Sequence, residues 1–368
     1  MKVTKVGVIG CGNIFQSYAK GDEIFHQIKI VGVADIFPEK AKEVEEKYGY
    51  KAYATVDDLL KDDEIEIVVN LTIPKVHAEV DKQILNAGKH VFSEKPIACT
   101  VEEAKEVVEL AKSKGLRVGV APDTFMGAGI QTCIKLIDEG WIGDVFGVSM
   151  NMIGGGPDGW HPNPDFFFKP GAGPMLDMGP YYVTALVSLF GPIESVTGIS
   201  TCAREKRYIT FPVDRIGEYI DVEVPTHNNC LFKLKSGVVA NFTCSFDAPC
   251  GSQNQKFEVY GTKGTLIVPD PNTYGVPIKI VLPGQEIKEV PYANFNYTGY
   301  LRGLGVADMA VAIEEGRPHR ANGDMAYHVL EAMLAVYESS DAKKTIDLKT
   351  TCDRPLPMVL DLPNGIID

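Results

Sequence analysis

A short apolar run stands directly before a glycine-rich turn near the start of the chain, and this feature constrains the fold most. Residues 5–9 lead into Gly10-Cys11-Gly12-Asn13-Ile14-Phe15. A strand that ends in Gly-x-Gly and turns into a helix lets backbone N–H groups approach a pyrophosphate, whose charge the helix N-terminus favours. Phe15 departs from this pattern, because glycine or alanine usually stands there. The predicted cofactor contacts in this loop are Gly10, Cys11, Gly12, Asn13 and Ile14.

The second apolar run, residues 28–34, ends at Asp35. A carboxylate about 20 residues after the glycine loop is placed to accept a hydrogen bond from a ribose 2′-hydroxyl. The same carboxylate would repel a 2′-phosphate, and Ile36 and Phe37 follow it instead of arginine or lysine. The sequence therefore predicts that Asp35 binds NAD and that NADP is the less suitable cofactor.

Short apolar runs alternate with amphipathic helical stretches up to about residue 122, which is typical of a parallel sheet wrapped by helices. Thr100, with Glu103 three residues later, has the spacing of a capping box that starts one of these helices. We therefore predict an α/β chain with a doubly wound Rossmann domain over residues 1–123. Strands are expected at residues 6–9, 30–34, 65–71, 90–92 and 117–121, and helices at 38–48, 76–87 and 100–114.

The remaining residues, 124–368, have the pattern of an α+β domain with an open, largely antiparallel sheet. A helix is expected at residues 130–139, and closing helices at 300–315 and 324–340 are expected to pack near the domain interface. Turn signals separate β-like segments, which we interpret as an antiparallel meander. Those segments are residues 228–234, 238–246, 256–260, 265–268, 278–282 and 287–290.

Composition excludes several classes of function. The 368 residues suffice for two domains, and the formal net charge of −13 argues against a nucleic-acid partner. We expect no signal peptide and no membrane-spanning segment, and hence a cytoplasmic protein. The eight cysteines are scattered without zinc-ligand spacing, so we expect free buried thiols and no metal site.

Polar residues follow two consecutive predicted strands at the edge where an open α/β sheet binds its ligand. Thr72-Ile73-Pro74, with His77 beyond, follows the strand at 65–71, and Glu94-Lys95-Pro96 follows the next. Burial and a nearby cofactor would lower the pKa of Lys95, so that it polarises a carbonyl or relays a proton. Pro96 makes a cis peptide bond possible, which would aim the lysine. The predicted cofactor contacts here are Thr72, Ile73, Pro74, His77, Glu94 and Lys95.

Asp177 and Tyr181 lie four residues apart in a glycine-rich segment that we expect to feed one long helix through Leu189. Helical spacing would put the carboxylate and the phenol on one face, where both could address the same substrate hydroxyl. Alternatively, Asp177 caps the helix and Tyr181 packs in its first turn.

The chain resembles the Gfo/Idh/MocA family of oxidoreductases in Gly10-x-Gly12, Asp35, Glu94-Lys95-Pro96 and Asp177-x-Gly179. The resemblance implies reversible oxidation of a secondary alcohol of a sugar, polyol or glycoside, with Lys95 as the motif lysine and Asp177 beside the reacting hydroxyl. Tyr181 stands where the family commonly has a histidine base, as in branches of the family that carry tyrosine there. We predict that Lys95, Asp177 and Tyr181 are catalytic, with the Lys95 ammonium stabilising the Tyr181 phenolate.

A loop rich in aromatic and hydrogen-bonding residues, 154–169, precedes Asp177 and suits a sugar substrate. The predicted substrate contacts outside the catalytic residues are Trp160, His161, Lys169 and, more weakly, Asp123. An exposed loop with incidental aromatic residues would give the same pattern. The uncovered sheet face further predicts a homodimer or homotetramer.

Two other functions are compatible with these residues. One is a lyase or epimerase that keeps its NAD bound and recycles it within each turnover. The other is a regulator that binds NAD(H) without catalysis, against which the retention of Lys95 and Asp177 speaks.

Overall fold

A parallel sheet forms the first part of the protein, as the sequence predicts, but it has six strands because the short β3 joins the five predicted ones. The computed structural model describes residues 2–293, 295–299 and 301–368. The strand order is β3-β2-β1-β4-β5-β6, with all neighbours parallel, which is a doubly wound arrangement. The strands are β1 (Thr4–Ile9), β2 (Ile28–Ala34), β3 (Lys51–Ala52), β4 (Ile67–Asn70), β5 (His90–Ser93) and β6 (Val118–Val120).

The helices of this part begin and end where local sequence signals place them. Thr100 and Glu103 form the predicted capping box, and the helix that they start ends at Gly115, which has a left-handed backbone. Phe15 is buried, and its ring packs edge-on against Tyr48, 5.8 Å between centroids, so this large side chain is accommodated. The helices are α1 (Phe15–Ile24), α2 (Pro38–Tyr48), α3 (Val56–Leu60), α4 (His77–Asn86) and α5 (Val101–Lys114).

A nine-stranded, mostly antiparallel sheet forms the second part, with the order β16-β15-β14-β13-β7-β12-β11-β8-β17. The predicted simple meander is wrong, because β7 lies between β12 and β13 and runs parallel to β12. A parallel neighbour needs a long crossover, which the turn signals around residues 228–290 do not reveal. The strands are β7 (Val145–Ile153), β8 (Ile193–Thr201), β11 (His227–Leu234), β12 (Val239–Ser245), β13 (Phe257–Gly261), β14 (Thr265–Ile267), β15 (Ile278–Val281), β16 (Lys288–Val290) and β17 (Ile346–Asp347).

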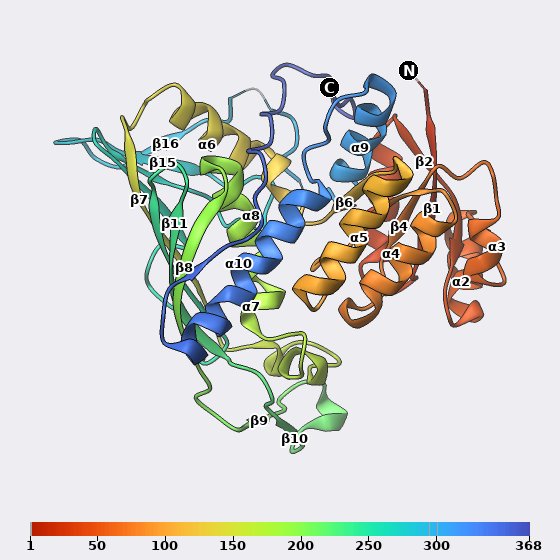
Figure 1. Cartoon of the computed structure of the whole chain (residues 1–368), viewed down its shortest axis with the longest axis horizontal. Coiled ribbons are helices and arrows are strands. Elements are labelled where there is room, and N and C mark those ends of the chain that lie inside the picture. Colours follow the sequence, from red (N-terminus) through yellow and green to blue (C-terminus); the bar gives the residue numbers. More distant parts are fainter. Residues whose placement is uncertain (1, 294, 300) are drawn as a thin grey trace.

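Helices of the second part fill the space between the two sheets (Figure 1). The longest one, α10, packs on β8 of the second sheet and on α5 of the first part, while α9 contacts β2 and β6. The closing helices therefore lie at the domain interface, as expected, although the predicted start at residue 300 lies outside the described residues. The helices are α6 (Ala128–Asp138), α7 (Pro174–Asp177), α8 (Gly179–Phe190), α9 (Leu304–Glu315) and α10 (Gly323–Ala342).

The predicted single helix around Asp177 is instead two helices, because the helix is interrupted at Met178, between α7 and α8. Pro180 lacks the N–H that would bond to the carbonyl four residues earlier, and so it interrupts the hydrogen-bond ladder. The N–H of Tyr181 bonds to the carbonyl of Met178 at 3.1 Å. Asp177 and Tyr181 therefore do not share one continuous helix face.

A small lobe of two strands, β9 (Lys206–Tyr208) and β10 (Tyr219–Asp221), projects from the second sheet at the bottom of Figure 1. Arg207 fixes the base of this lobe, because its guanidinium is 2% exposed and forms ion pairs with Asp158 at 2.7 Å and Asp247 at 2.9 Å.

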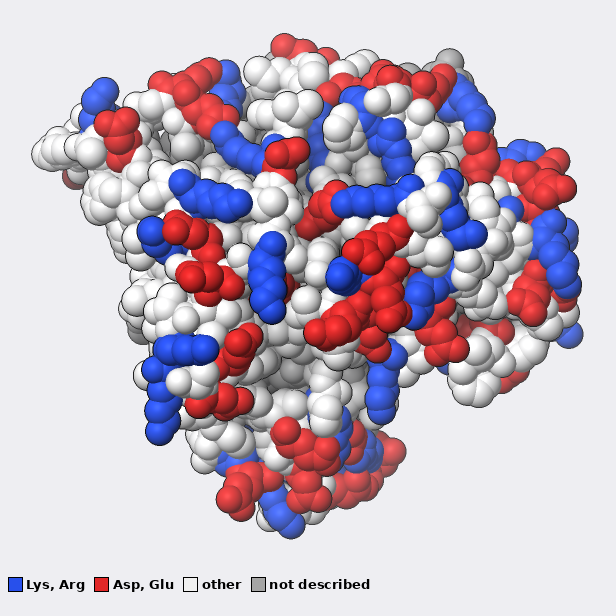
Figure 2. All heavy atoms as spheres, in the orientation of Figure 1, with Lys and Arg blue, Asp and Glu red and all other residues white. Residues whose placement is uncertain are grey.

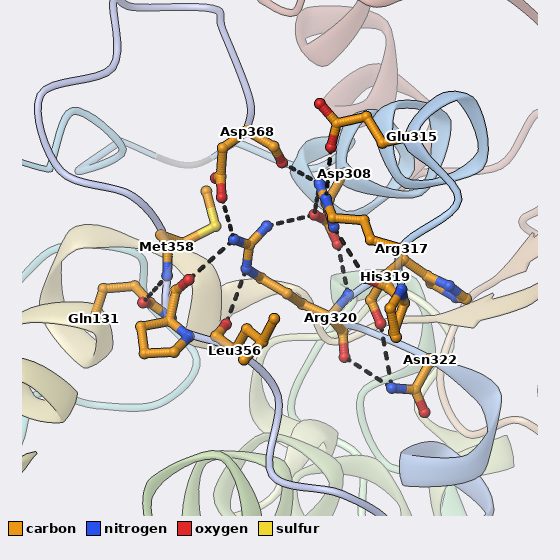
Figure 3. A network of polar contacts seen from close by, with 12 residues as sticks. Gln131, Asp308, Glu315, Arg317, His319, Arg320, Asn322, Leu356, Met358 and Asp368 are labelled. Carbon is orange, nitrogen blue, oxygen red and sulfur yellow. Dashed lines mark hydrogen bonds and ion pairs between the residues drawn. The ribbon is translucent and has the colours of Figure 1, made fainter.

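The last part of the chain, residues 356–368, is held by Arg320 (Figure 3). This guanidinium pairs with buried Asp308 on α9 at 2.6 Å and with Asp368 at 2.5 Å. The backbone N–H of Met358 donates to Gln131 on α6 at 2.7 Å. These contacts fasten residues 356–368 to α6, to α9 and to the segment before α10.

Surface and thiol properties agree only partly with the sequence predictions. On the face in Figure 2, lysine and arginine side chains are interspersed with acidic ones and form no single basic patch. All eight cysteines are free, as predicted, but only four are buried, since Cys202 and Cys250 are exposed and Cys11 and Cys99 are partly exposed. In the described ranges, no helix is both long and apolar enough to cross a membrane, and no cluster of candidate metal ligands is found.

Candidate active site

The turn between β1 and α1 has one tightly packed glycine and one open glycine. Gly10 has a φ of 100°, which L side chains rarely adopt, and it packs against the backbone of Leu71. Around Gly12, by contrast, no atom lies within 4 Å of the position that a Cβ would take, so this side of the loop is open. Gly12 lies just before the start of α1, and the open space beside it could accommodate a phosphate group.

Asp35 closes the same turn from the end of β2. Its carboxylate accepts hydrogen bonds from the backbone N–H of Cys11 at 2.7 Å and from that of Phe37 at 2.9 Å. The side chain is therefore fixed beside the glycine loop, where a ribose hydroxyl would reach its remaining lone pairs. Gly12 and Asp35 together fit a bound NAD.

The loop after β4 is held by buried polar groups. The Asn70 side-chain oxygen accepts from the Thr72 N–H at 3.1 Å and from its hydroxyl at 2.7 Å. His77 is 1% exposed, and its ring nitrogens lie 2.7 Å from the Pro96 carbonyl oxygen and 3.0 Å from that of Thr72. Burial lowers the pKa of His77. His77 thus braces this loop against the one after β5, and Ile73, 65% exposed, lies at the open edge.

The loop after β5 carries Glu94 and Lys95 toward the second part of the protein. Glu94 is buried and accepts a hydrogen bond from the Tyr18 hydroxyl of α1 at 2.9 Å. The Lys95–Pro96 peptide is cis, which the sequence allowed. The Lys95 ammonium donates to the Asp177 carboxylate at 2.9 Å and to the Asp177 carbonyl at 2.7 Å.

The helix break explains why Asp177 offers both of these oxygens. In a continuous helix its carbonyl would accept from the N–H of Tyr181, but that N–H bonds to Met178 instead. The carbonyl is therefore available to Lys95, and the carboxylate is 21% exposed next to it. The structure thus brings together the predicted lysine and aspartate, with the Lys95 Nζ 5.1 Å from the centre of the Tyr181 ring.

The expected lowering of the Lys95 pKa is wrong for this arrangement. Burial acts in that direction, but the charge of Asp177, reinforced by Tyr181 and Glu94, outweighs it and raises the pKa of Lys95 above its usual range. Lys95 is therefore held as an ammonium, which can donate a hydrogen bond but cannot accept a proton.

The hydrogen-bond partner of the Tyr181 phenol is a residue that the sequence did not suggest. Arg302, 2% exposed, donates from Nη2 to the Tyr181 hydroxyl at 2.9 Å. Its other terminal nitrogen pairs with Asp123 at 3.3 Å. Asp123 is fully buried and accepts from the Tyr274 hydroxyl at 2.5 Å and from the N–H of Gly305 at 3.0 Å. Asp123 therefore supports Arg302 and does not face a substrate, contrary to the prediction.

Comparisons with known proteins identify the family of this chain. The family model for the Gfo/Idh/MocA oxidoreductase family, NAD-binding Rossmann fold, matches residues 4–121, and the model for its C-terminal domain matches residues 130–267. Together these matches cover most of the chain. The chain belongs to the Gfo/Idh/MocA family.

Relatives of this Gfo/Idh/MocA protein include enzymes with named substrates. It is 26% identical to inositol 2-dehydrogenase of Rhizobium meliloti over 94% of this chain and 99% of that one. An uncharacterised oxidoreductase of Schizosaccharomyces pombe is 33% identical, but the match spans 58% of this chain and only 56% of that relative. A solved structure of levoglucosan dehydrogenase with NADH and levoglucosan shares the fold with a TM-score of 0.80 at 22% identity, covering 95% of this chain and 100% of that one.

The predicted substrate loop of this Gfo/Idh/MocA protein is partly engaged elsewhere. Lys169 forms an ion pair with Glu223 at 2.6 Å near the small lobe. Trp160 is 63% exposed and packs edge-on against His161, 5.4 Å between ring centres, and His161 Nδ1 lies 2.9 Å from the carbonyl oxygen of Asn163. These three residues therefore do not join the Lys95–Asp177 pair through any hydrogen bond or ion pair found among the described residues.

Arg302 and Tyr274 are the functional candidates that sequence reasoning missed. A single arginine in a loop is a solvated surface residue by default, and neither residue belongs to a recognisable motif. Position alone gave one signal, because Arg302 falls within residues 300–315, the closing helix that we expected at the domain interface.

Proposed function

We propose that this protein is an NAD-dependent oxidoreductase that transfers a hydride between nicotinamide and a secondary alcohol of a sugar, polyol or glycoside. The observation that carries the proposal is the meeting of Lys95, from the edge of the nucleotide-binding sheet, with Asp177 and Tyr181 from the second part. A dehydrogenase acting on an alcohol needs a hydride acceptor and one residue that accepts or donates the hydroxyl proton. Family membership and the inositol 2-dehydrogenase relative support this substrate class.

Each of the three side chains has a distinct role in this proposal. The Asp177 carboxylate, partly exposed and fixed by Lys95, accepts a hydrogen bond from a substrate hydroxyl and orients the alcohol. The Lys95 ammonium stabilises negative charge that develops on the alcohol oxygen. Tyr181 takes the proton during oxidation and returns it during reduction. When bound, the nicotinamide accepts or supplies the hydride.

The proposed cofactor is NAD and not NADP. Two backbone N–H groups fix Asp35 beside the glycine loop, and its charge would repel the 2′-phosphate of NADP. We expect Asp35→Ser to weaken NAD binding and to narrow the preference over NADP, measured by titrating each nucleotide into the protein. An unchanged preference would remove Asp35 from cofactor selection.

We further propose that the protein forms a homodimer or homotetramer through the outer face of the second sheet. Helices α8 and α10 lie on the side that faces the nucleotide-binding sheet, and no helix of the described ranges covers the other side (Figure 1). Ile199, Leu231 and Val239 on adjacent strands are each about half exposed or more. Apolar side chains gathered in this way on one sheet face favour association.

A substrate screen with a matched pair of lysine variants tests the proposed reaction. Monosaccharides, inositols and glycosides are incubated with NAD or NADP, and reduced nicotinamide is followed by its absorbance. Lys95→Ala should keep nucleotide binding and lose turnover by roughly a hundredfold or more. Lys82→Ala, which removes the exposed ion pair with Glu106, is the control and should behave as wild type.

The outcomes separate the alternatives. Wild-type turnover by Lys95→Ala would remove this lysine from the mechanism. Consumption of substrate without net formation of reduced nicotinamide would instead indicate an enzyme that recycles bound NAD. Nucleotide binding without turnover of any polyol would indicate a regulator.

A further inference from the structure

Two cations lie next to the Tyr181 phenol, and they differ in what they bond to. The hydrogen bonds of the Lys95 ammonium go to Asp177, while its Nζ lies over the Tyr181 ring. Arg302 donates directly to the phenol oxygen at 2.9 Å. Direct donation stabilises an ionised oxygen more than a cation placed over the ring, so Arg302 is the better placed of the two.

Arg302 is held in this position from several sides. Its carbonyl oxygen packs against Gly21 of α1, where any side chain would collide with it. Its guanidinium is paired with Asp123, which Tyr274 and the Gly305 N–H fix in turn. This arginine and its support are buried, so the guanidinium acts on the phenol in surroundings where charge is little screened.

We propose that Arg302 is a positioning residue that stabilises the ionised phenol of Tyr181, in place of the Lys95 ammonium. The proposal rests on the proposed function, in which Tyr181 takes the substrate proton. During oxidation the hydroxyl O–H bond of the alcohol breaks and its proton forms a new O–H bond on the Tyr181 oxygen. Bound NAD would supply the acceptor for the hydride, which carries its electron pair away from the carbon. Arg302 keeps all its protons, and Lys95 remains free to fix Asp177 and to bind the alcohol oxygen.

The other charged groups around the pair come from separate elements of the fold. Glu94 and Lys95 follow β5, Asp123 follows β6, and Asp177 is the last residue of α7. Two further titratable residues, Tyr18 on α1 and Tyr274 after β14, lie near these charged groups. Each carboxylate already has a partner, since Asp177 bonds to Lys95, Asp123 to Tyr274 and Glu94 to Tyr18. Without the Arg302 guanidinium, the negative charge of Asp123 would no longer be offset by that cation. This negative charge would make ionisation of the Tyr181 phenol still less favourable.

An NMR titration of the full chain tests the proposal without any substrate. Tyrosine is labelled with carbon-13 at ring Cζ, and the Tyr181 signal is identified by its absence in Tyr181→Phe. In Arg302→Met the midpoint of the Tyr181 titration should rise by about one pH unit or more, which is a tenfold change in the ionisation constant. Arg207→Met removes another arginine with a 2% exposed side chain, outside the site, and should leave the midpoint unchanged.

Further variants keep the test decisive if Arg302→Met does not fold, and they distinguish failure of this inference from failure of the proposed function. If Arg302→Met does not fold, Arg302→Met with Asp123→Asn removes both charges together, and the midpoint should still rise because the phenol loses its direct donor. Arg302→Lys keeps a cation and should restore part of the shift. An unchanged midpoint without Arg302, or an equal rise in Arg207→Met, would overturn the inference. Full turnover by Tyr181→Phe would instead overturn the role of Tyr181 in the proposed function, whatever the titration shows.

Discussion

Alanine at position 10 and alanine at position 12 should have opposite consequences, although both change a glycine of the same loop. At position 10 the backbone φ is 100°, and an added Cβ would lie 2.7 Å from the carbonyl oxygen of Leu71. That oxygen belongs to the backbone and cannot rotate away. At position 12 no atom lies within 4 Å of the added Cβ. The first change should therefore affect folding, and the second should affect the ligand.

The magnitudes follow from these two geometries. An alanine held at a strained φ costs about 1–3 kcal/mol, and forcing a methyl group into a packed site costs about 1–3 kcal/mol more. Gly10→Ala should thus lower the free energy of unfolding by roughly 2–6 kcal/mol, the sum of these two costs. Gly12→Ala should change it by less than about 0.5 kcal/mol. Its methyl group would, however, occupy the space through which backbone N–H groups approach a phosphate, and NAD affinity should fall by roughly tenfold or more.

Denaturant unfolding and calorimetric titration with NAD measure the two effects separately. We expect Gly10→Ala to unfold at a lower denaturant concentration, and Gly12→Ala to unfold like wild type while binding NAD more weakly. Wild-type NAD affinity in Gly12→Ala would refute the assignment of this loop to the pyrophosphate. Wild-type stability in Gly10→Ala would refute the packing argument.

Three further predictions concern stability and assembly. Arg320→Met leaves the buried Asp308 carboxylate with Arg317, at 3.0 Å, as its cationic partner and should cost about 1.5–3 kcal/mol in denaturant unfolding; a loss below about 0.5 kcal/mol would contradict it. Burial lowers the pKa of His328 to about 4, so folding favours the neutral ring, and stability should fall as the pH drops from about 6.5 toward 4. His328→Asn should flatten this slope in unfolding measured across that range, and an unchanged slope would argue against the assignment. Leu231→Asp on the sheet face should shift light-scattering mass toward the monomer, whereas Val213→Asp, at a residue on the lobe that is even more exposed (78% against 50%), should not.

The local sequence determined the parts of this protein that depend on neighbours along the chain. The turn at Gly10 and Gly12, the carboxylate of Asp35 at the end of β2 and the capping box of Thr100 all lie where the residue pattern predicts. These features follow from backbone preferences and side-chain periodicity, which a short stretch of residues fully contains. Lys95 and Asp177 were recognised as candidates for the same reason, each from its own motif.

Only the tertiary structure decided how these candidates meet. Lys95 and Asp177 are 82 positions apart, and Arg302 and Tyr181 are 121 apart, so no local pattern relates them. Because the helix breaks at Met178, Asp177 binds Lys95 through both its carbonyl and its carboxylate and does not share a helix face with Tyr181. The loop before α9 packs against Gly21, which places Arg302 next to the Tyr181 phenol. The placement of β7 between β12 and β13 is another such outcome. A contact between distant segments depends on how the whole core packs, and the sequence of either segment alone does not determine that packing.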